Sequence, residues 1–123
     1  KMELAVQIVQ VIVALGIFNV WLLRFNNSSE WRGGSASNMK EEFQTYGLSE
    51  NVMYLVGGLK VLAAVLLIVS IWVPELTLPA AGIMAVLMAG AISMHVRVKD
   101  PLKRSFPALI FLVLSVFLIL YNT

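Results

Sequence analysis

The residue best suited to do chemistry in this sequence is a lysine inside an apolar segment. Lys60 is the ninth residue of the run Val52–Val73. At ~1.5 Å per helical residue it lies ~13 Å into a hydrocarbon layer ~30 Å thick, where a charge costs ~2.5–3.5 kcal/mol. Three interpretations stay open: the side chain extends to the headgroups, it pairs with a loop carboxylate, or it serves a ligand site. The carboxylates that could reach it are Glu30, Glu41, Glu42 and Glu50.

Other polar side chains gather toward the same end of the apolar segments. Asn19 lies near the end of the first segment, Tyr54 near the start of the second, and His95 near the end of the third. We expect them to line a polar pocket with Lys60, under the first long loop as a lid. The predicted ligand-binding residues are Lys60, His95, Asn19, Tyr54, Trp31, Arg32, Glu42 and Tyr46.

His95 is the only histidine, and two roles are open for it. The neighbouring cations Arg97 and Lys99 disfavour protonation of the ring, which favours an interfacial hydrogen-bonding group over a catalyst. An acid–base role for His95 or Lys60 on a membrane-soluble substrate remains the alternative.

The elements that must position these residues are membrane-spanning helices. The chain is 59% hydrophobic and 13% charged, whereas a soluble domain is about 25% charged. We predict an all-α membrane protein: a four-transmembrane-helix bundle with a short amphipathic helix in the first loop, forming one domain over residues 1–123. The expected spans are residues 4–23, 52–73, 76–96 and 106–121.

Composition also excludes several kinds of site. The sequence has no cysteine, which removes disulfides, thiol redox relays and thiolate metal ligands. A single histidine excludes bis-His haem ligation within one chain. We therefore predict no metal site.

The long connection Arg24–Glu50 is expected to contain the short helix. Asn38 can cap its first turn and Gly47 can close it. Met39, Phe43 and Tyr46 follow at helical spacing and form an apolar stripe. Such a helix either lies on the membrane surface or covers the end of the bundle.

The basic residues predict the orientation in the membrane. With four spans, the two longer loops share one side, and both termini share the other with the short turn. Lys60 is inside the membrane and Lys1 lies on the terminal side; the other seven Lys and Arg residues lie in or beside the two loops, at Arg24, Arg32, Lys40, Arg97, Lys99, Lys103 and Arg104. The loops are thus expected to be cytoplasmic and both termini outside. This distribution points to lipid headgroups rather than to nucleic acid.

Interfacial positions are predicted for the three tryptophans, Trp21, Trp31 and Trp72.

Several polar motifs carry a resemblance to a known family. They are Glu30-Trp31-Arg32-Gly33-Gly34-Ser35, Lys40-Glu41-Glu42-Phe43, Tyr46-Gly47-Leu48, Gly57-Gly58-Leu59-Lys60 and His95-Val96-Arg97-Val98-Lys99-Asp100-Pro101. With the hydropathy pattern, they resemble the DoxX-like family over nearly the whole chain. The resemblance implies a small four-helix protein of a bacterial-type inner membrane. Some relatives are associated with thiosulfate:quinone oxidoreductase or oxidative-stress complexes. Because this chain has no cysteine and no haem or flavin equipment of its own, a redox role here would require a partner or a bound quinone.

Three functions remain to be weighed, and the first is favoured. It is a binding module that holds a lipid-like or quinone-like molecule, an apolar compound with a polar head, at Lys60 and His95. The second is an accessory or scaffold subunit whose loop cations dock a protein partner, a second copy or anionic membrane lipids. The third is a membrane enzyme acting on an apolar substrate. A small drug exporter is disfavoured because the first span has no central carboxylate.

Overall fold

A computed structural model describes residues 2–122, and every regular element in that range is helical. The four long helices are α1 (Met2–Phe18), α3 (Glu50–Val69), α4 (Thr77–Arg97) and α5 (Phe106–Tyr121). With the short turns that extend them, they give four segments long and apolar enough to cross a membrane: Glu3–Leu23, Glu50–Val69, Pro74–Arg97 and Leu102–Tyr121. The predicted all-α fold with four transmembrane helices is confirmed.

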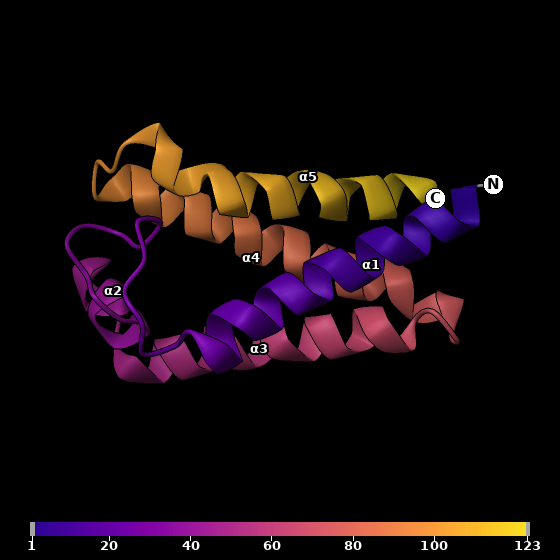
Figure 1. Ribbon diagram of the computed structural model, residues 1–123, viewed down its shortest axis with the longest axis horizontal. Helices are drawn as coiled ribbons and strands as arrows, with labels where there is room; N and C mark the ends of the chain where they lie inside the picture. The colour runs from indigo at the N-terminus through magenta and orange to yellow at the C-terminus, as the bar shows by residue number, and fades with distance from the viewer. Residues whose placement is uncertain (1, 123) are drawn as a thin grey trace.

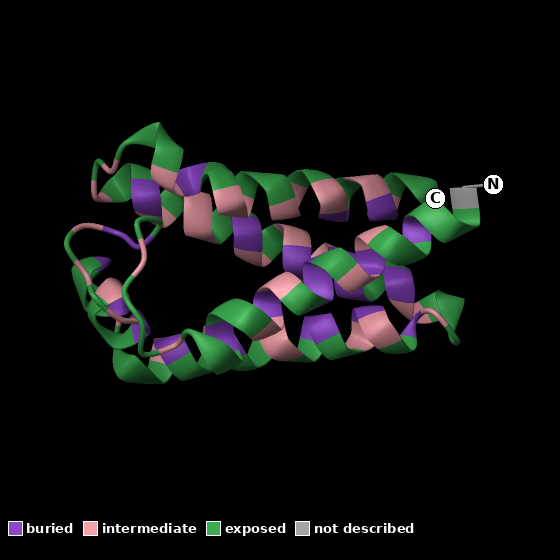
Figure 2. Cartoon of the chain, in the orientation of Figure 1, coloured by how far each residue is buried: buried purple, intermediate pink, exposed green. Residues whose placement is uncertain are grey.

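The helices pack as a bundle whose most enclosed residues lie in the part toward the chain termini. A short 3-10 turn at Pro74–Leu76 joins α3 and α4 into a hairpin, α5 packs along α4, and α1 crosses α3 (Figure 1). The buried faces of the helices point at one another and their exposed faces point outward (Figure 2). Small side chains allow close approach of helix backbones in a membrane. The fully enclosed residues at the centre of this part are accordingly Val13, Ala14, Ala63, Ala64, Leu67, Ala80, Ala81, Met84 and Leu118.

The last turn of the first span is wider than an α-helix and contains a buried tryptophan. Residues Asn19–Leu23 form a π-helical turn, closed by a hydrogen bond from the Arg24 amide to the Asn19 carbonyl at 2.9 Å. Trp21 is only 7% exposed and packs on α3 at Gly57, where a Cβ atom would overlap the indole. The interfacial position predicted for Trp21 is therefore wrong: it continues the buried face of Ala14 and Ile17 at helical spacing, and its ring lies in the core.

The short helix predicted in the first long loop is present as α2 (Met39–Thr45). The Asn38 side chain caps it by accepting from the Glu41 amide at 2.8 Å. At its other end, Gly47 has a positive φ of 78°, and the Leu48 amide bonds back to the Phe43 carbonyl at 2.9 Å. This arrangement is a Schellman motif, in which a left-handed residue closes the helix.

The apolar stripe of α2 decides between the two positions left open for it. Met39, Phe43 and Tyr46 are 3%, 7% and 6% exposed, and the first two belong to the main hydrophobic core. Helix α2 therefore covers the end of the bundle, where it packs against α3 (Figure 1).

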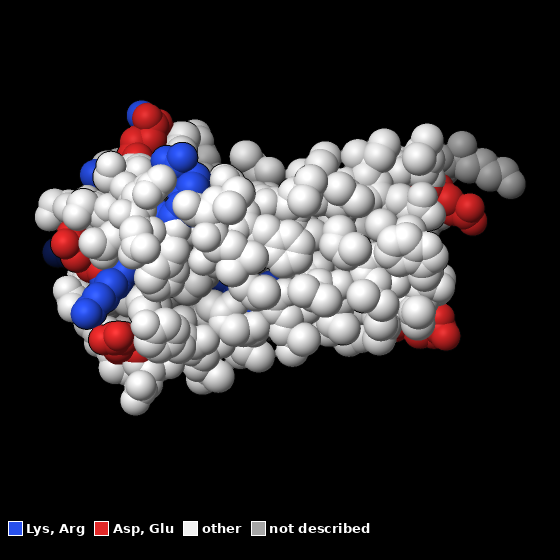
Figure 3. Space-filling model, turned by 60° about the horizontal axis from the view of Figure 1, so that its bottom comes forward, with Lys and Arg blue, Asp and Glu red and all other residues white. Residues whose placement is uncertain are grey.

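The two ends of the bundle differ in charge. The loop with α2 and the α4–α5 connection share one end, and the α3–α4 turn shares the other with both termini (Figure 1). Lys and Arg side chains gather at the loop-bearing end in Figure 3, whereas only acidic side chains are coloured at the far end in that view. Lys1, which was expected at the far end, lies outside the described residues.

Candidate functional site

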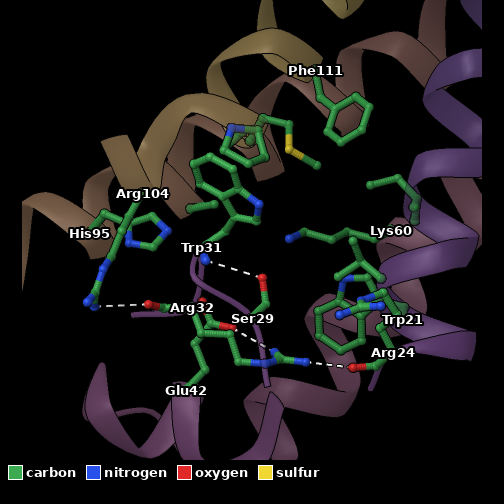
Figure 4. Close-up of a pocket in the computed structure, with 16 residues that line it drawn as sticks. Trp21, Arg24, Ser29, Trp31, Arg32, Glu42, Lys60, His95, Arg104 and Phe111 are labelled. Carbon is green, nitrogen blue, oxygen red and sulfur yellow. Dashed lines mark hydrogen bonds and ion pairs between the residues drawn. The ribbon is translucent and has the colours of Figure 1, made fainter. Parts of the chain in front are cut away.

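Two cavities meet at the loop-bearing end of the bundle, under the first long loop. Their volumes are about 160 Å³ and 380 Å³. The first opens toward α5 and the segment with Trp31, and the second lies between α2, α3 and α4. Six residues line both cavities: Val20, Trp21, Glu42, Lys60, Ala91 and His95. The two spaces are thus neighbouring parts of one site, whose first part is drawn in Figure 4.

Lys60 reaches this site because it belongs to the buried face of α3. The spacing of four and three residues along Met53, Gly57, Lys60, Ala64 and Leu67 keeps one helix face together. The Lys60 ammonium lies 5.4 Å from the centre of the Trp21 ring, within range of a cation–π interaction. Figure 4 shows the side chain extended into the cavity above Trp21.

No carboxylate in residues 2–122 forms an ion pair with Lys60. Within the described chain, Glu30 pairs with Lys103 and Glu50 pairs with Lys40. Glu41 accepts from the Ser37 amide and hydroxyl instead. Glu42, which shares both cavities with Lys60, is held by Arg32 and other donors. Of the three interpretations of Lys60, pairing with a loop glutamate is therefore wrong for the described residues.

A buried ion pair between Arg32 and Glu42 fixes the loop above the site. Arg32 Nη1 lies 2.9 Å from Glu42 Oε1, and the two side chains are 5% and 12% exposed. The guanidinium also donates to the carbonyls of Asn27, at 2.8 Å, and Arg24, at 2.7 Å. Arginine suits this role because its planar fork bonds several acceptors at once. Arg32 thus ties the irregular loop to α2.

A histidine–aspartate pair forms where α4 ends. The Asp100 amide donates to the His95 carbonyl and the Lys99 amide to the Val96 carbonyl, both at 3.0 Å, with Lys99 at a φ of 59°. These two bonds form a second Schellman motif, which folds residue 100 back beside residue 95. His95 Nδ1 and Asp100 Oδ2 then lie 2.8 Å apart, with both side chains less than a tenth exposed. His95 is therefore a buried hydrogen-bonding partner of Asp100 in the last turn of α4; its position relative to the membrane surface stays a prediction.

The surroundings of Asp100 keep it ionised. Burial alone would raise the pKa of Asp100, but hydrogen bonds from His95 and the Gly34 amide, with the charge of Arg104, hold this pKa below its usual range. An ionised carboxylate only accepts hydrogen bonds, so Nδ1 of His95 carries a proton in this contact. In the neutral form of the ring, Nε2 would then carry the lone pair.

Tyr46 closes the row of polar groups between Glu42 and His95. Its hydroxyl donates to Glu42 Oε2 at 2.6 Å and lies 3.5 Å from His95 Nε2. Burial raises the pKa of Tyr46 well above its usual range, and the charge of Glu42 adds to this. Because the single phenol proton is directed at Glu42, a neutral His95 Nε2 receives no hydrogen bond from Tyr46.

The structure brings together six of the eight predicted binding residues. Lys60, His95, Trp31, Arg32, Glu42 and Tyr46 line the cavities. Tyr54 does not, because it lies one position after the buried Met53, about 100° around the helix, and is 60% exposed. Asn19 also lies outside the cavities and is exposed at the start of the π turn.

Sequence reasoning missed Asp100 and the second role of Arg104. Arg104 was counted among the loop cations available to a partner, but Nη1 lies 3.2 Å from Asp100 Oδ1 and donates to the carbonyls of Arg32 and Gly34. The sequence pattern that could have predicted the contact between Asp100 and His95 lies in residues 95–101, where an aspartate and a proline follow the end of the helix. Within residues 2–122, no group of three or more His, Cys, Asp or Glu side chains is arranged to hold a metal ion.

Comparison with protein families decides the relationship of this chain. A family model described as DoxX-like family matches residues 8–118, which include the whole of α3 and α4, most of α1 and α5, and every residue of the site. The chain belongs to the DoxX-like family. No curated protein and no solved structure matched it. This DoxX-like protein is thus an integral membrane protein by family and by its four apolar helices.

Proposed function

We propose that this DoxX-like protein binds an apolar small molecule with a polar head, of lipid or quinone type, in the two joined cavities. The observation that carries the proposal is Lys60, a lysine between membrane-spanning helices that faces a cavity and has no ion pair within residues 2–122. A charged side chain at such a position is expected to serve a function.

The walls of the cavities suit the two parts of such a molecule. Apolar side chains from the helices, among them Ile17, Phe111, Val56 and Leu87, line the deeper surfaces. Glu42, Lys60 and His95 supply the polar groups next to the loop. A few polar groups in a mainly apolar concavity are typical of a small-molecule site.

The proposal is tested by identifying what the purified protein carries. Wild type, Lys60→Met and Lys40→Met are purified in a mild detergent, extracted with solvent, and the extracts are compared by mass spectrometry. Lys40 is the matched control because it lies at the same end of the bundle and is exposed. We expect one lipid or quinone species at near-stoichiometric amount in wild type and Lys40→Met, and its loss from Lys60→Met. Identical extracts of bulk lipid from all three proteins would contradict the proposal.

We also propose that the loop-bearing end faces the cytoplasm of a bacterial cell and that both termini lie outside the inner membrane. The gathering of Lys and Arg at that end supports this orientation (Figure 3). The sequence has no cysteine, so Gln44→Cys and Glu75→Cys each supply a single label site at opposite ends. In intact spheroplasts, a membrane-impermeant maleimide should label Glu75→Cys and leave Gln44→Cys unlabelled until lysis. The reverse pattern would overturn the orientation.

A second candidate function, an enzyme acting on an apolar substrate, is favoured by His95. Its Nδ1 is held by Asp100 and its ring lines both cavities, so that Nε2, when unprotonated, is available as an oriented general base. An enzyme of this kind would exchange a substrate proton with solvent. Incubation of the extracted molecule with protein in D₂O should raise its mass by one unit with wild type and not with His95→Gln. No exchange with wild type would remove this candidate.

A further inference from the structure

The charged groups around the first cavity do not balance. Its lining contains four cations, Arg24, Arg32, Lys60 and Arg104, but Glu42 is its only carboxylate among the described residues. Two of these cations are compensated. Arg32 is paired with Glu42, and Arg104 with Asp100 directly behind the wall.

The remaining two cations have no carboxylate partner in residues 2–122. Lys60 lies over the face of the Trp21 ring and makes no ion pair, although the charge of Glu42 also acts on it. Arg24 donates one hydrogen bond, at 3.3 Å, to the carbonyl of Ser28. The cavity therefore carries two cationic side chains that no ion pair within the described chain compensates.

Among the described side chains of this wall, hydrogen-bond donors without a partner also outnumber such acceptors, as the cations outnumber the carboxylates. Among the donors on this wall that have no acceptor within the described residues are the Lys60 ammonium and the Trp31 indole N–H. Trp31 donates only through its backbone amide, to the Ser29 hydroxyl. Figure 4 shows the Trp31 ring and the end of Lys60 turned toward the same opening. An ammonium offers three N–H donors and an indole offers one.

The Glu42 carboxylate near these donors already accepts three hydrogen bonds. Glu42 Oε1 accepts from Arg32 at 2.9 Å, and Oε2 accepts from the Gly33 amide at 3.1 Å and from Tyr46 at 2.6 Å. A ligand that enters here meets free donors and positive charge, and a carboxylate whose two oxygens are both bonded.

We infer that the head of the bound molecule is an anion, an oxyanion such as a carboxylate or a phosphate, held by Lys60, Arg24 and the Trp31 N–H. This inference rests on the proposed binding function and narrows its ligand class: a neutral quinone carbonyl would satisfy the donors but leave both charges uncompensated. The apolar lining at Ile17 and Phe111 receives the tail of the molecule, so the ligand is an anionic amphiphile.

Quenching of tryptophan fluorescence tests the inference with a matched pair of probes. The protein has three tryptophans; Trp21 and Trp31 line the cavity, and Trp72 is exposed at the far end. In a Trp72→Phe background at pH 8, 9,10-dibromostearate and its methyl ester are titrated into the detergent-solubilised protein. The two probes share a quenching tail and differ in the charge of the head. We expect half-maximal quenching by the acid at about a tenfold lower concentration than by the ester.

Variants assign the preference to the cavity. Lys60→Met should remove most of the tenfold preference, Lys60→Arg should retain most of it, and Lys40→Met should leave it unchanged. Arg24→Gln, a change at an exposed side chain, should reduce the preference and carries the test if Lys60→Met does not fold by circular dichroism.

The possible outcomes separate the inference from the function on which it rests. Saturable quenching with equal affinity for acid and ester would overturn the anionic head and leave the binding function standing. Absence of saturable quenching by either probe would overturn both. Displacement of dibromostearate by inorganic phosphate at the same concentration would assign the cations to a small free anion and overturn the amphiphile.

Discussion

The two ends of this bundle bury polar groups in different ways. Toward the termini, Gln10 donates to the hydroxyls of Ser70, at 2.8 Å, and Thr77, at 3.1 Å, and all three are at most 3% exposed. These three residues line a third cavity, of about 290 Å³, near the chain termini, and their polar groups are neutral. Toward the loops, the buried groups are charged, and they surround cavities of about 160 Å³ and 380 Å³.

A buried neutral group and a buried charged group differ in how many compensating partners they require. A neutral amide is accommodated with two hydrogen bonds, although Gln10 Oε1 has no partner among the described residues. A buried charge needs a compensating charge and several donors, since its removal from water costs several kcal/mol. Arg32 and Asp100 have such partners, whereas Lys60 does not. The group without a compensating charge is therefore the place where we propose that a ligand binds.

The largest effect on stability is expected from breaking the buried ion pair. Arg32→Met should lower the free energy of unfolding by about 3–5 kcal/mol, because it leaves the Glu42 charge buried without its partner. Unfolding by SDS in mixed micelles, followed by circular dichroism, measures the loss. Lys103→Met is the control: it breaks an ion pair with Glu30 in which both side chains are more than 60% exposed, so it should cost at most about 1 kcal/mol. Equal losses in the two variants would show that the loop-bearing end does not depend on buried charge.

The next effect concerns Asp100 and depends on pH. Asp100→Asn should cost about 1.5–3 kcal/mol at neutral pH, because a charged acceptor for His95 and Arg104 is lost. The folded-state pKa of Asp100 is lowered, so its contribution is complete above the ordinary pKa of ~3.9 and disappears as the pH falls through the folded value. When unfolding is measured from pH 6 downward, the free energies of unfolding of wild type and Asp100→Asn should converge in acid. A constant difference across this range would contradict the assignment.

A steric comparison on α3 separates the packed face from the lipid-facing surface. Gly57→Ala should destabilise by about 1–3 kcal/mol, because the new Cβ overlaps the Trp21 ring. Gly58→Ala is the matched control, since nothing lies within 4 Å of its Cβ position, and it should be neutral or stabilise by about 0.5–1 kcal/mol. Thermal unfolding and the Trp emission maximum report both variants. Tolerance of Gly57→Ala with an unchanged emission spectrum would disprove the contact with Trp21.

The smallest effect is expected at the neutral end. Gln10→Leu should change the unfolding free energy by only about 0.6 kcal/mol, the average for interhelical hydrogen bonds in membranes. Ser70 retains its own bond to the Leu67 carbonyl at 2.6 Å, so little is left unsatisfied. The same SDS titration measures the change beside that of Arg32→Met. A loss as large as that of Arg32→Met would remove the distinction between the two ends.

The fold was predictable because its signals are local. Apolar length fixes the four spans, and Asn38 and Gly47 mark the ends of the short helix to within a residue or two. The buried spacing through Lys60 and Gly57 is also visible in the sequence, and it could have placed Lys60 inside the bundle and excluded Tyr54.

The site was only partly predictable because its contacts join distant segments. No local sequence pattern predicts the π turn at Asn19–Leu23, or the bonds that bring Arg104 to carbonyls some seventy residues earlier in the chain. Asp100 is intermediate: its motif is local, but a lysine stands at the left-handed position where glycine is usual.

Native mass spectrometry tests the central claim, that Lys60 holds a molecule in the cavity, most directly. The intact protein is released from detergent and the mass bound per chain is measured for wild type, Lys60→Met and Lys40→Met. If Lys60 holds the molecule, we expect one retained molecule of a single mass on wild type and Lys40→Met, and none on Lys60→Met. The same distribution of bound masses on all three proteins would contradict it.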